Sequence, residues 1–420
     1  MKETANLLAD ARSCARRLSS AGEESRNAAL DSIGRALAEE QQPILEANAE
    51  DVSAARRAGI SDALIDRLML DVRRMRAVLD SVREVRALPD PLSEERYVGE
   101  RPNGLRVAKR RVPLGVLAVV YEARPNVTVE AAALAIKSGN AVVLRGGREA
   151  LRSNAALVRS IRSGLERSSL PADCVQLIED PSRERVSELL GSKSQIDLAV
   201  ARGGPELMAL VDACARVPVI RHGQGITHLF IDQTAELTMA KQIVLNSKTQ
   251  RPGVCNALET LLVHRDAVAS GAFRSIAQSL TQSGVELRVD PEAAASLEPA
   301  GIPFVAAGEE DWDTEFLSLV LAVRTVPSLE AALRHIAEHG TQHTASIVTA
   351  DRENAERFLR EVDASCVLWN ASTRFNDGGE LGLGSEMGIS TSKMHAFGPM
   401  GLRELTAEKF VVYGTGQVRG

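Results

Sequence analysis

The feature of this sequence that most constrains its fold is the regular alternation of apolar and amphipathic runs between residues 115 and 221. Short apolar runs indicate buried strands, and helical periodicity fills each interval between them. The predicted strands lie at 115–122, 140–147, 173–179, 195–201 and 217–221. Strands separated by single helices form a parallel sheet with right-handed crossovers. We therefore expect a doubly wound nucleotide-binding type of α/β domain, with ligands at the carboxyl ends of the strands.

Changes in hydrophobic pattern and glycine content elsewhere in the chain indicate further structural regions. The first ninety residues show helical periodicity and no strand pattern, and a second α/β unit runs from "THLFID" to "ASCVLWNAS". After it comes a glycine-rich stretch, which in a globular chain is usually a functional loop, and then the strand-like tail "KFVVYGTGQ". We expect N-terminal helices with a nucleotide-binding α/β domain, a second α/β domain that carries Cys255, and a loop and tail that return to the first domain or to an oligomerisation region. Their expected boundaries are 1–224, 225–375 and 376–420.

A basic hairpin is predicted at about residues 97–112, where Asn103-Gly104 joins two strand-like arms. It is long and has no adjacent core. Two interpretations are equally open: a surface hairpin, or an arm that pairs with another subunit. Together with the strand-like tail, it favours at least a dimer.

Composition excludes several classes of function. The net charge is −6 and aromatic residues make up 3% of the chain, which argues against nucleic-acid binding. No apolar run approaches the roughly 20 residues of a membrane span, and we expect a cytoplasmic protein. The five cysteines are far apart and none forms a CxxC pair, so neither a disulfide framework nor a structural metal site is expected.

Cys255 is placed unlike an ordinary core cysteine. It follows Pro252-Gly253 within "NSKTQRPGVCNALETLLV", so the thiol should emerge on a loop ahead of an apolar strand. Lys248 and Arg251 lie close in sequence, and nearby cations favour the reactive thiolate. An inert loop cysteine is the alternative. A thiol that accepts an acyl or aldehyde carbon also needs an oxyanion donor. Asn126, just past the first predicted parallel strand, could supply its amide, or could simply cap the following helix.

Two Gly-Gly turns follow predicted strands of the first sheet. Gly203-Gly204 would allow a pyrophosphate to approach the backbone at a helix start. Arg145, in "LRGGRE", could meet a phosphate or a ribose hydroxyl, so these residues do not decide between NADP and NAD. No GxxxxGK[ST] or clean GxGxxG motif is present.

Three long strings resemble the aldehyde dehydrogenase superfamily: "VPLGVLAVVYEARPNVTVEAAALAIKSGNAVVLRGGREA", "NSKTQRPGVCNALETLLVH" and "WNASTRFNDGGELGLGSEMGIST" with "HAFGPMGL". The resemblance covers nearly the whole chain and is closest to the branch that reduces an acyl phosphate. It implies an NADPH-dependent reduction of L-glutamyl 5-phosphate to L-glutamate 5-semialdehyde, with release of phosphate, as the second step of L-proline biosynthesis. Glutamate 5-kinase would be the enzyme that supplies the substrate.

The resemblance also implies roles for individual residues. Cys255 matches the nucleophile and Asn126 the oxyanion amide. Arg145 stands near the adenosine ribose, Gly203 and Gly204 lie in the cofactor-facing turn, and Glu315 resembles the glutamate that holds the nicotinamide ribose. Candidates for the substrate's phosphate or carboxylate are Arg124, Lys248 and Arg251, with surface solvation as the alternative for each.

One departure from the hydrolytic members of the superfamily is informative. Where they carry a general-base glutamate, this chain reads "RHGQGITH", with no acid. An acyl-phosphate reductase needs no base to activate water, because thiolate attack expels phosphate directly. Open alternatives are a reductase of another acyl phosphate, an aldehyde dehydrogenase that uses coenzyme A, and a catalytically silent nucleotide-binding module.

Overall fold

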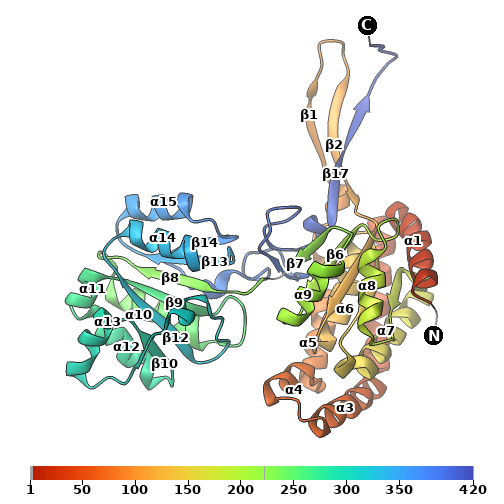
Figure 1. Cartoon of the computed structure of the whole chain (residues 1–420). Helices are drawn as coiled ribbons and strands as arrows, with labels where there is room; N and C mark the ends of the chain where they lie inside the picture. The colour runs from red at the N-terminus through yellow and green to blue at the C-terminus, as the bar shows by residue number, and fades with distance from the viewer. Residues whose placement is uncertain (1–2, 222, 420) are drawn as a thin grey trace. The chain divides into compact units, whose positions relative to one another are not determined.

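The computed structural model describes residues 3–221 and 223–419. Two compact α/β units make up the chain (Figure 1). Unit 1 comprises Met1–His222, Gly382–Gly388 and Met400–Gly420, and unit 2 comprises Gly223–Leu381 and Ile389–Pro399. Among the described residues, no helix has both the length and the apolarity for a bilayer span.

Unit 1 is built on a five-stranded parallel sheet with the strand order β5-β4-β3-β6-β7. The strands are β3 (Val116–Tyr121), β4 (Ala141–Arg145), β5 (Val175–Leu177), β6 (Leu198–Arg202) and β7 (Val219–Arg221). Each overlaps one of the segments predicted from the sequence, and only β6 extends past its segment, by one residue, which confirms the doubly wound parallel sheet. β3 is buried along its whole length, as a strand covered on both faces must be.

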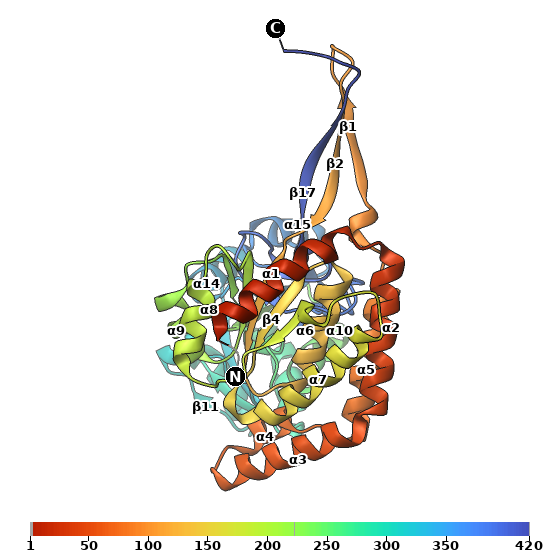
Figure 2. The same cartoon turned by 90° about the vertical axis from the view of Figure 1, so that its right-hand side faces the viewer.

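The helices of unit 1 form a layer on each face of this sheet. They are α1 (Thr4–Ser20), α2 (Glu23–Glu39), α3 (Gln41–Arg57), α4 (Asp62–Leu68), α5 (Val72–Ala87), α6 (Pro125–Lys137), α7 (Leu151–Glu166), α8 (Arg183–Gly191) and α9 (Pro205–Cys214). Helices α1, α8 and α9 pack on one face, in a core that includes Val116, Ala118 and Val120 of β3. The intervening β3 residues point to the opposite face, where α6 and α7 contact the strands. Helices α2, α3 and α5 pack against α6 and α7 from outside (Figure 2).

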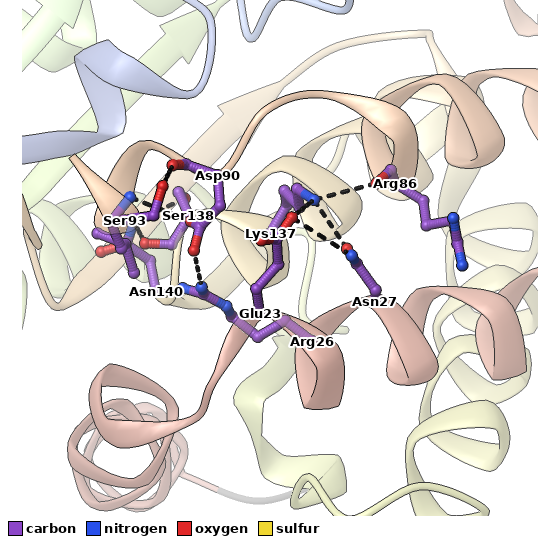
Figure 3. Close-up of polar contacts among 10 residues, drawn as sticks. Glu23, Arg26, Asn27, Arg86, Asp90, Ser93, Lys137, Ser138 and Asn140 are labelled. Carbon is purple, nitrogen blue, oxygen red and sulfur yellow. Dashed lines mark hydrogen bonds and ion pairs between the residues drawn. The ribbon is translucent and has the colours of Figure 1, made fainter.

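Buried charges tie the C-terminal end of α6 to the N-terminal helices (Figure 3). Lys137 is fully buried, and its Nζ lies 2.8 Å from the Asn27 side-chain oxygen and 3.0 Å from the Arg86 carbonyl oxygen. Nearby, a buried ion pair joins Arg26 of α2 to Asp90 at 2.5 Å. Removing one member of such a pair would leave a buried charge uncompensated. These contacts therefore hold α6 in one position against α2 and α5.

A three-stranded antiparallel arm extends from the body of unit 1 in both views (Figures 1 and 2). It consists of β1 (Glu95–Glu100), β2 (Arg106–Pro113) and β17 (Thr406–Tyr413), with β2 in the centre. The hairpin and the strand-like tail predicted from the sequence both form, and they pair with each other. Gly104 has φ +82° in the loop between β1 and β2, a conformation that favours glycine.

Unit 2 contains a seven-stranded parallel sheet with the order β11-β10-β12-β9-β8-β13-β14. Its strands are β8 (Thr227–Ile231), β9 (Leu258–His264), β10 (Glu286–Val289), β11 (Val305–Ala306), β12 (Val320–Val326), β13 (Thr344–Val348) and β14 (Cys366–Trp369). Its helices are α10 (Leu237–Thr249), α11 (Arg265–Ala269), α12 (Ala272–Gln282), α13 (Pro291–Leu297), α14 (Leu329–His339) and α15 (Arg352–Glu361). The glycine-rich stretch adds a short antiparallel pair, β15 (Ile389–Ser390) with β16 (Gly398–Pro399).

Both faces of the unit 2 sheet are covered. Helices α10 to α13 share one apolar cluster with Leu229 and Ile231 of β8. Helices α14 and α15 share another with Phe230, the residue between them. Successive side chains of β8 thus point to opposite faces of the sheet, so the same strand contributes to both apolar cores.

Two of the buried histidines of unit 2 lie against each other. His228 of β8 and His335 of α14 have ring centroids 5.3 Å apart, and the Trp312 ring lies 5.7 Å from that of His335. His228 Nδ1 is 2.9 Å from the Ile226 carbonyl oxygen. Burial lowers the pKa of His228 to about 4. The pKa of His335 is also lowered, chiefly by burial and then by the nearby His228, His339 and Arg324.

The buried histidines predict acid-sensitive folding. In the unfolded chain His228 binds a proton near pH 6.5, whereas in the folded protein it does so only near pH 4. Its contribution is therefore complete above about pH 6.5 and is lost as the pH falls toward 4, by roughly 3 kcal/mol from this residue. Urea unfolding at about pH 7 and pH 4.5 measures the loss. His228→Asn keeps an N–H donor but removes the titrating group, so its stability should fall less between the two values. An equal fall in both proteins would contradict this account.

Candidate active site

Cys255 lies half-buried on a loop between α10 and β9. Pro252 cannot continue a helix, and α10 ends at Thr249. The Cys255 carbonyl oxygen accepts a hydrogen bond from Thr227 Oγ1 at 3.0 Å. A Cβ at Gly225 would lie 2.2 Å from the same oxygen. The position thus requires glycine, because the Gly225 backbone packs directly against the cysteine loop.

The base of the cysteine loop is closed by an ion pair that is fully buried. Lys248, near the end of α10, places Nζ 2.6 Å from the carboxylate of Glu259 in β9, and both side chains are 0% exposed. The other Glu259 oxygen accepts a hydrogen bond from the Leu317 N–H at 3.1 Å. Burial raises the pKa of Glu259 and lowers that of Lys248, and each charge opposes the shift of the other. The pair joins the two ends of the loop to the segment before β12.

Arg374 is the cation that the fold brings to Cys255 from far along the sequence. It interacts electrostatically with the cysteine, and burial lowers the pKa of its guanidinium. Its Nε donates to Gln250 Oε1 at 2.9 Å. Asn256, next to Cys255, donates to the Asn376 carbonyl oxygen at 2.9 Å, so the segment carrying Arg374 is fastened to the cysteine loop. Sequence reasoning missed Arg374 because the two segments lie more than a hundred residues apart, although "WNASTRF" belongs to one of the resembling strings.

Glu315 lies in the irregular segment that precedes β12. Its carboxylate accepts a hydrogen bond from the Gly225 N–H at 3.0 Å. Because Gly225 packs on Cys255, Glu315 and the cysteine loop are neighbours within unit 2. Leu317, two residues on, has φ +51°, and the strand therefore begins only at Val320.

The substrate-binding candidates lie in different surroundings. Lys248 is fully buried in its ion pair, so we assign it a structural role beneath the loop. Arg251 is exposed in the turn ahead of Cys255. Arg124 is half-buried in unit 1, where it is the N-cap residue of α6.

Asn126 lies in the first turn of α6 and is half-buried. Its side-chain amide donates to Glu130 Oε1 at 2.9 Å. The N-cap position is held by Arg124, and no side chain caps this helix. The alternative interpretation of Asn126 as a helix cap is therefore wrong. Its amide carries two N–H donors, and the contact with Glu130 orients the group.

Two glutamates organise the carboxyl edge of the unit 1 sheet. Glu122, after β3, accepts a hydrogen bond from the Gly204 N–H at 2.7 Å. A Cβ at Gly203 would lie 2.5 Å from the same carboxylate, so a larger residue there would displace the Glu122 side chain. Glu149, after β4, accepts a hydrogen bond from the N–H of Ala123, which has φ +42°. The loops after three adjacent strands are thereby connected.

Arg145 ends β4 at the same edge and is 8% exposed. Its guanidinium donates to the carbonyl oxygens of Pro181 and Ser182, at 2.6 and 3.3 Å. Burial lowers its pKa. Arg145 thus braces the loop after β5 and places positive charge beneath the edge where a parallel sheet binds its ligands.

Comparison with known proteins relates the chain to one family. A model of the aldehyde dehydrogenase family matches residues 2–296. A gamma-glutamyl phosphate reductase of Anaeromyxobacter sp. (strain Fw109-5) is 53% identical over 100% of this chain and 97% of its own length. The enzyme of the same name from Geobacter metallireducens is 48% identical, over 98% of each chain. The crystal structure of the Thermotoga maritima gamma-glutamyl phosphate reductase superposes with a TM-score of 0.95, at 41% identity and over 100% of both chains.

Breaking the buried ion pair between Lys248 and Glu259 should lower the free energy of unfolding strongly, and removing both charges should cost less than the two single losses together. Lys248→Met or Glu259→Gln should each lower the free energy of unfolding by about 3–5 kcal/mol, because each leaves one buried partner without its counterpart. The double variant Lys248→Met/Glu259→Gln should be less destabilised than the sum of the two single changes. Chemical denaturation measures both quantities. Hydrogen exchange of residues 250–257 should accelerate in the single variants, and additive losses with unchanged exchange would contradict the assignment.

Proposed function

Because this chain belongs to the gamma-glutamyl phosphate reductases of the aldehyde dehydrogenase family, we propose that it reduces L-glutamyl 5-phosphate to L-glutamate 5-semialdehyde with NADPH and releases phosphate. This reaction is the second step of L-proline biosynthesis from glutamate, and a glutamate 5-kinase would supply the acyl phosphate. The observation that carries the proposal is the placement of Cys255 on a clamped, half-buried loop beside a cation.

Cys255 is the nucleophile of the proposed reaction. The positive charge of Arg374 favours the thiolate, which is the reactive form of cysteine. The thiolate attacks the acyl carbon, forming the carbon–sulfur bond. The carbon–oxygen bond to phosphate then breaks, and phosphate leaves with the electron pair. The product of this half-reaction is a thioester on Cys255.

Asn126 is the proposed oxyanion donor. The negative charge that develops on the acyl oxygen needs preorganised N–H donors, and the amide of Asn126 is oriented by Glu130. The backbone N–H of Cys255 is the second proposed donor.

The residues at the carboxyl edge of the unit 1 sheet fit a nicotinamide dinucleotide. Gly203 and Gly204 give close backbone approach at the start of α9, and the buried Arg145 guanidinium supplies positive charge. Glu315 is the proposed partner of the nicotinamide ribose. A bound NADPH supplies hydride, the reductant that a thioester needs to become an aldehyde. When the tetrahedral adduct collapses, Cys255 leaves as thiolate and is ready for another cycle.

The segment 221–228 agrees with reduction rather than hydrolysis. It carries no acidic residue, and its Gly225 backbone fills the space against Cys255. Two acids that the fold brings near are already engaged, Glu259 by Lys248 and Glu315 by the Gly225 N–H. A thioester that water cannot readily attack survives until it is reduced.

An assay of the two proposed catalytic residues tests the function. Glutamate, ATP and a glutamate 5-kinase generate the labile substrate in place, and loss of NADPH absorbance reports turnover, with NADH as the comparison cofactor. Cys255→Ala should be inactive because no thioester forms, whereas Asn126→Ala should lose about 10²- to 10³-fold in kcat. Both variants should still bind NADPH, measured by fluorescence titration. A fully active Cys255→Ala enzyme would refute the mechanism.

The arm supports assembly into at least a homodimer. Its outer strand β17 exposes Phe410 and Val412, with 65% and 53% of each residue exposed, and β1 exposes Tyr97 at 60%. A narrow sheet with exposed apolar residues and open edges is a typical pairing surface. Sedimentation velocity should therefore show a dimer or larger species. Phe410→Glu should shift it toward monomer, whereas Lys409→Glu, next to it, should shift it less. A wild-type chain that remains monomeric at micromolar concentration would contradict this part.

A further inference from the structure

We propose that a pocket beside the cysteine loop binds the α-amino-acid end of the substrate, with Arg374 holding the α-carboxylate and Asp377 the α-ammonium group. The inference deepens the proposed function and rests on it. The pocket has a volume of about 230 Å³ and lies entirely within unit 2. It is lined by Asn246, Gln250, Arg374, Phe375, Asp377 and Glu380.

The pocket is joined directly to the cysteine loop. Gln250 is the residue at the end of α10, and its side-chain oxygen accepts the hydrogen bond from Arg374 Nε. Asn256 joins the cysteine loop to the segment that carries Arg374. Its side chain donates to the Asn376 carbonyl oxygen, and its own carbonyl oxygen accepts from Thr373 Oγ1 at 2.7 Å. The pocket and the thiol therefore share one rigid frame. In the proposed substrate, only three carbon–carbon bonds separate the α-carbon from the acyl carbon that the thiol attacks.

Arg374 has hydrogen-bonding capacity that the protein does not use. Its Nη1 is buried, and within 3–221 and 223–419 no acceptor lies in hydrogen-bond range. Leaving a buried donor without an acceptor is costly, and burial also lowers the pKa of this guanidinium. A carboxylate is the ligand that satisfies both the unused N–H and the partly buried charge, through charge-assisted hydrogen bonds.

The acidic residues of the pocket disfavour a ligand that carries more than one negative charge. Asp377 is half-buried, and its Oδ1 accepts from the Gly379 N–H at 3.0 Å and the Glu380 N–H at 3.4 Å, which fixes the orientation of the carboxylate. Glu380 adds a further carboxylate at the exposed rim. One guanidinium with two carboxylates suits a zwitterion, which brings one charge of each sign. A phosphate dianion would meet net repulsion at the same place.

Phosphate binding by Arg374 is the competing interpretation, because exposed Arg251 interacts electrostatically with it. The two interpretations predict different kinetics in the reverse reaction, in which an aldehyde, inorganic phosphate and NADP⁺ are the reactants. If Arg374 holds the α-carboxylate, its loss alters discrimination among aldehydes. If it holds phosphate, its loss raises the KM for phosphate and affects all aldehydes alike.

The experiment compares three aldehydes in the reverse direction: L-glutamate 5-semialdehyde, 4-aminobutanal, which lacks the α-carboxylate, and 5-oxopentanoate, which lacks the amino group. Wild-type kcat/KM should favour the complete substrate over each analogue by about 10- to 100-fold. In Arg374→Gln the preference over 4-aminobutanal should collapse while the preference over 5-oxopentanoate persists. Asp377→Asn, which keeps the Oδ1 acceptor, should show the converse. Arg352→Gln, a charge removal at a side chain 83% exposed on α15, should keep both ratios.

A second measurement separates this inference from the proposed function. L-Glutamate should protect Cys255 from iodoacetamide better than 4-aminobutyrate does, and Arg374→Gln should remove the difference. Such protection in a chain that turns over no aldehyde would uphold the pocket and refute the proposed reaction. An active enzyme in which Arg374→Gln leaves the aldehyde ratios unchanged, or raises the KM for phosphate instead, would overturn the pocket assignment.

Discussion

The ion pair between Lys248 and Glu259 is the contact on which the geometry of the cysteine loop depends. Both charges are withdrawn from water, so each is tolerable only while the other stays within bonding distance. The pair therefore holds the end of α10 against β9, and Cys255 lies on the loop between these two elements. The hydrogen bond from the Leu317 N–H joins the segment that carries Glu315 to the same ion pair. The loop that carries the Cys255 thiol is thus held more rigidly than loops usually are.

Close backbone approach is the second constraint on this loop. Gly225 and Thr227, from the segment that lacks an acid, contact the Cys255 carbonyl group by packing and by a hydrogen bond. The structure leaves no room for a side chain at Gly225, because a Cβ there would collide with the backbone of Cys255. In unit 1 the Glu122 carboxylate occupies the space where a Cβ of Gly203 would lie, so a larger residue there would displace a side chain rather than backbone. In both units, glycines near the proposed site let neighbouring groups approach the backbone closely.

Much of the fold was predictable because its signals are local. The strands of the first sheet, the hairpin with Asn103-Gly104 and the loop position of Cys255 each follow from a few adjacent residues, and the structure has them all. The site was less predictable. The sequence suggested that Lys248 binds the substrate, with a solvated surface position as the alternative. In the structure its side chain is buried against a carboxylate eleven residues away on a strand. Arg374 gave no local chemical signal, although it lies in one of the resembling strings, because its role depends on Gln250 and Cys255.

The sequence by itself determined the parallel α/β architecture, the helical N-terminal region, the hairpin, the strand-like tail and the break that presents Cys255, because hydrophobic periodicity and Pro-Gly chemistry act over short stretches of chain. Only the tertiary structure decided which charges are buried together and which remain available to a ligand. Burial and pairing are properties of residues that meet across the fold, such as Arg145 with the carbonyl groups after β5 and Arg374 with Gln250. Whether a cation braces a loop or can bind a ligand depends on what surrounds its charge, and that is set by packing rather than by sequence neighbours.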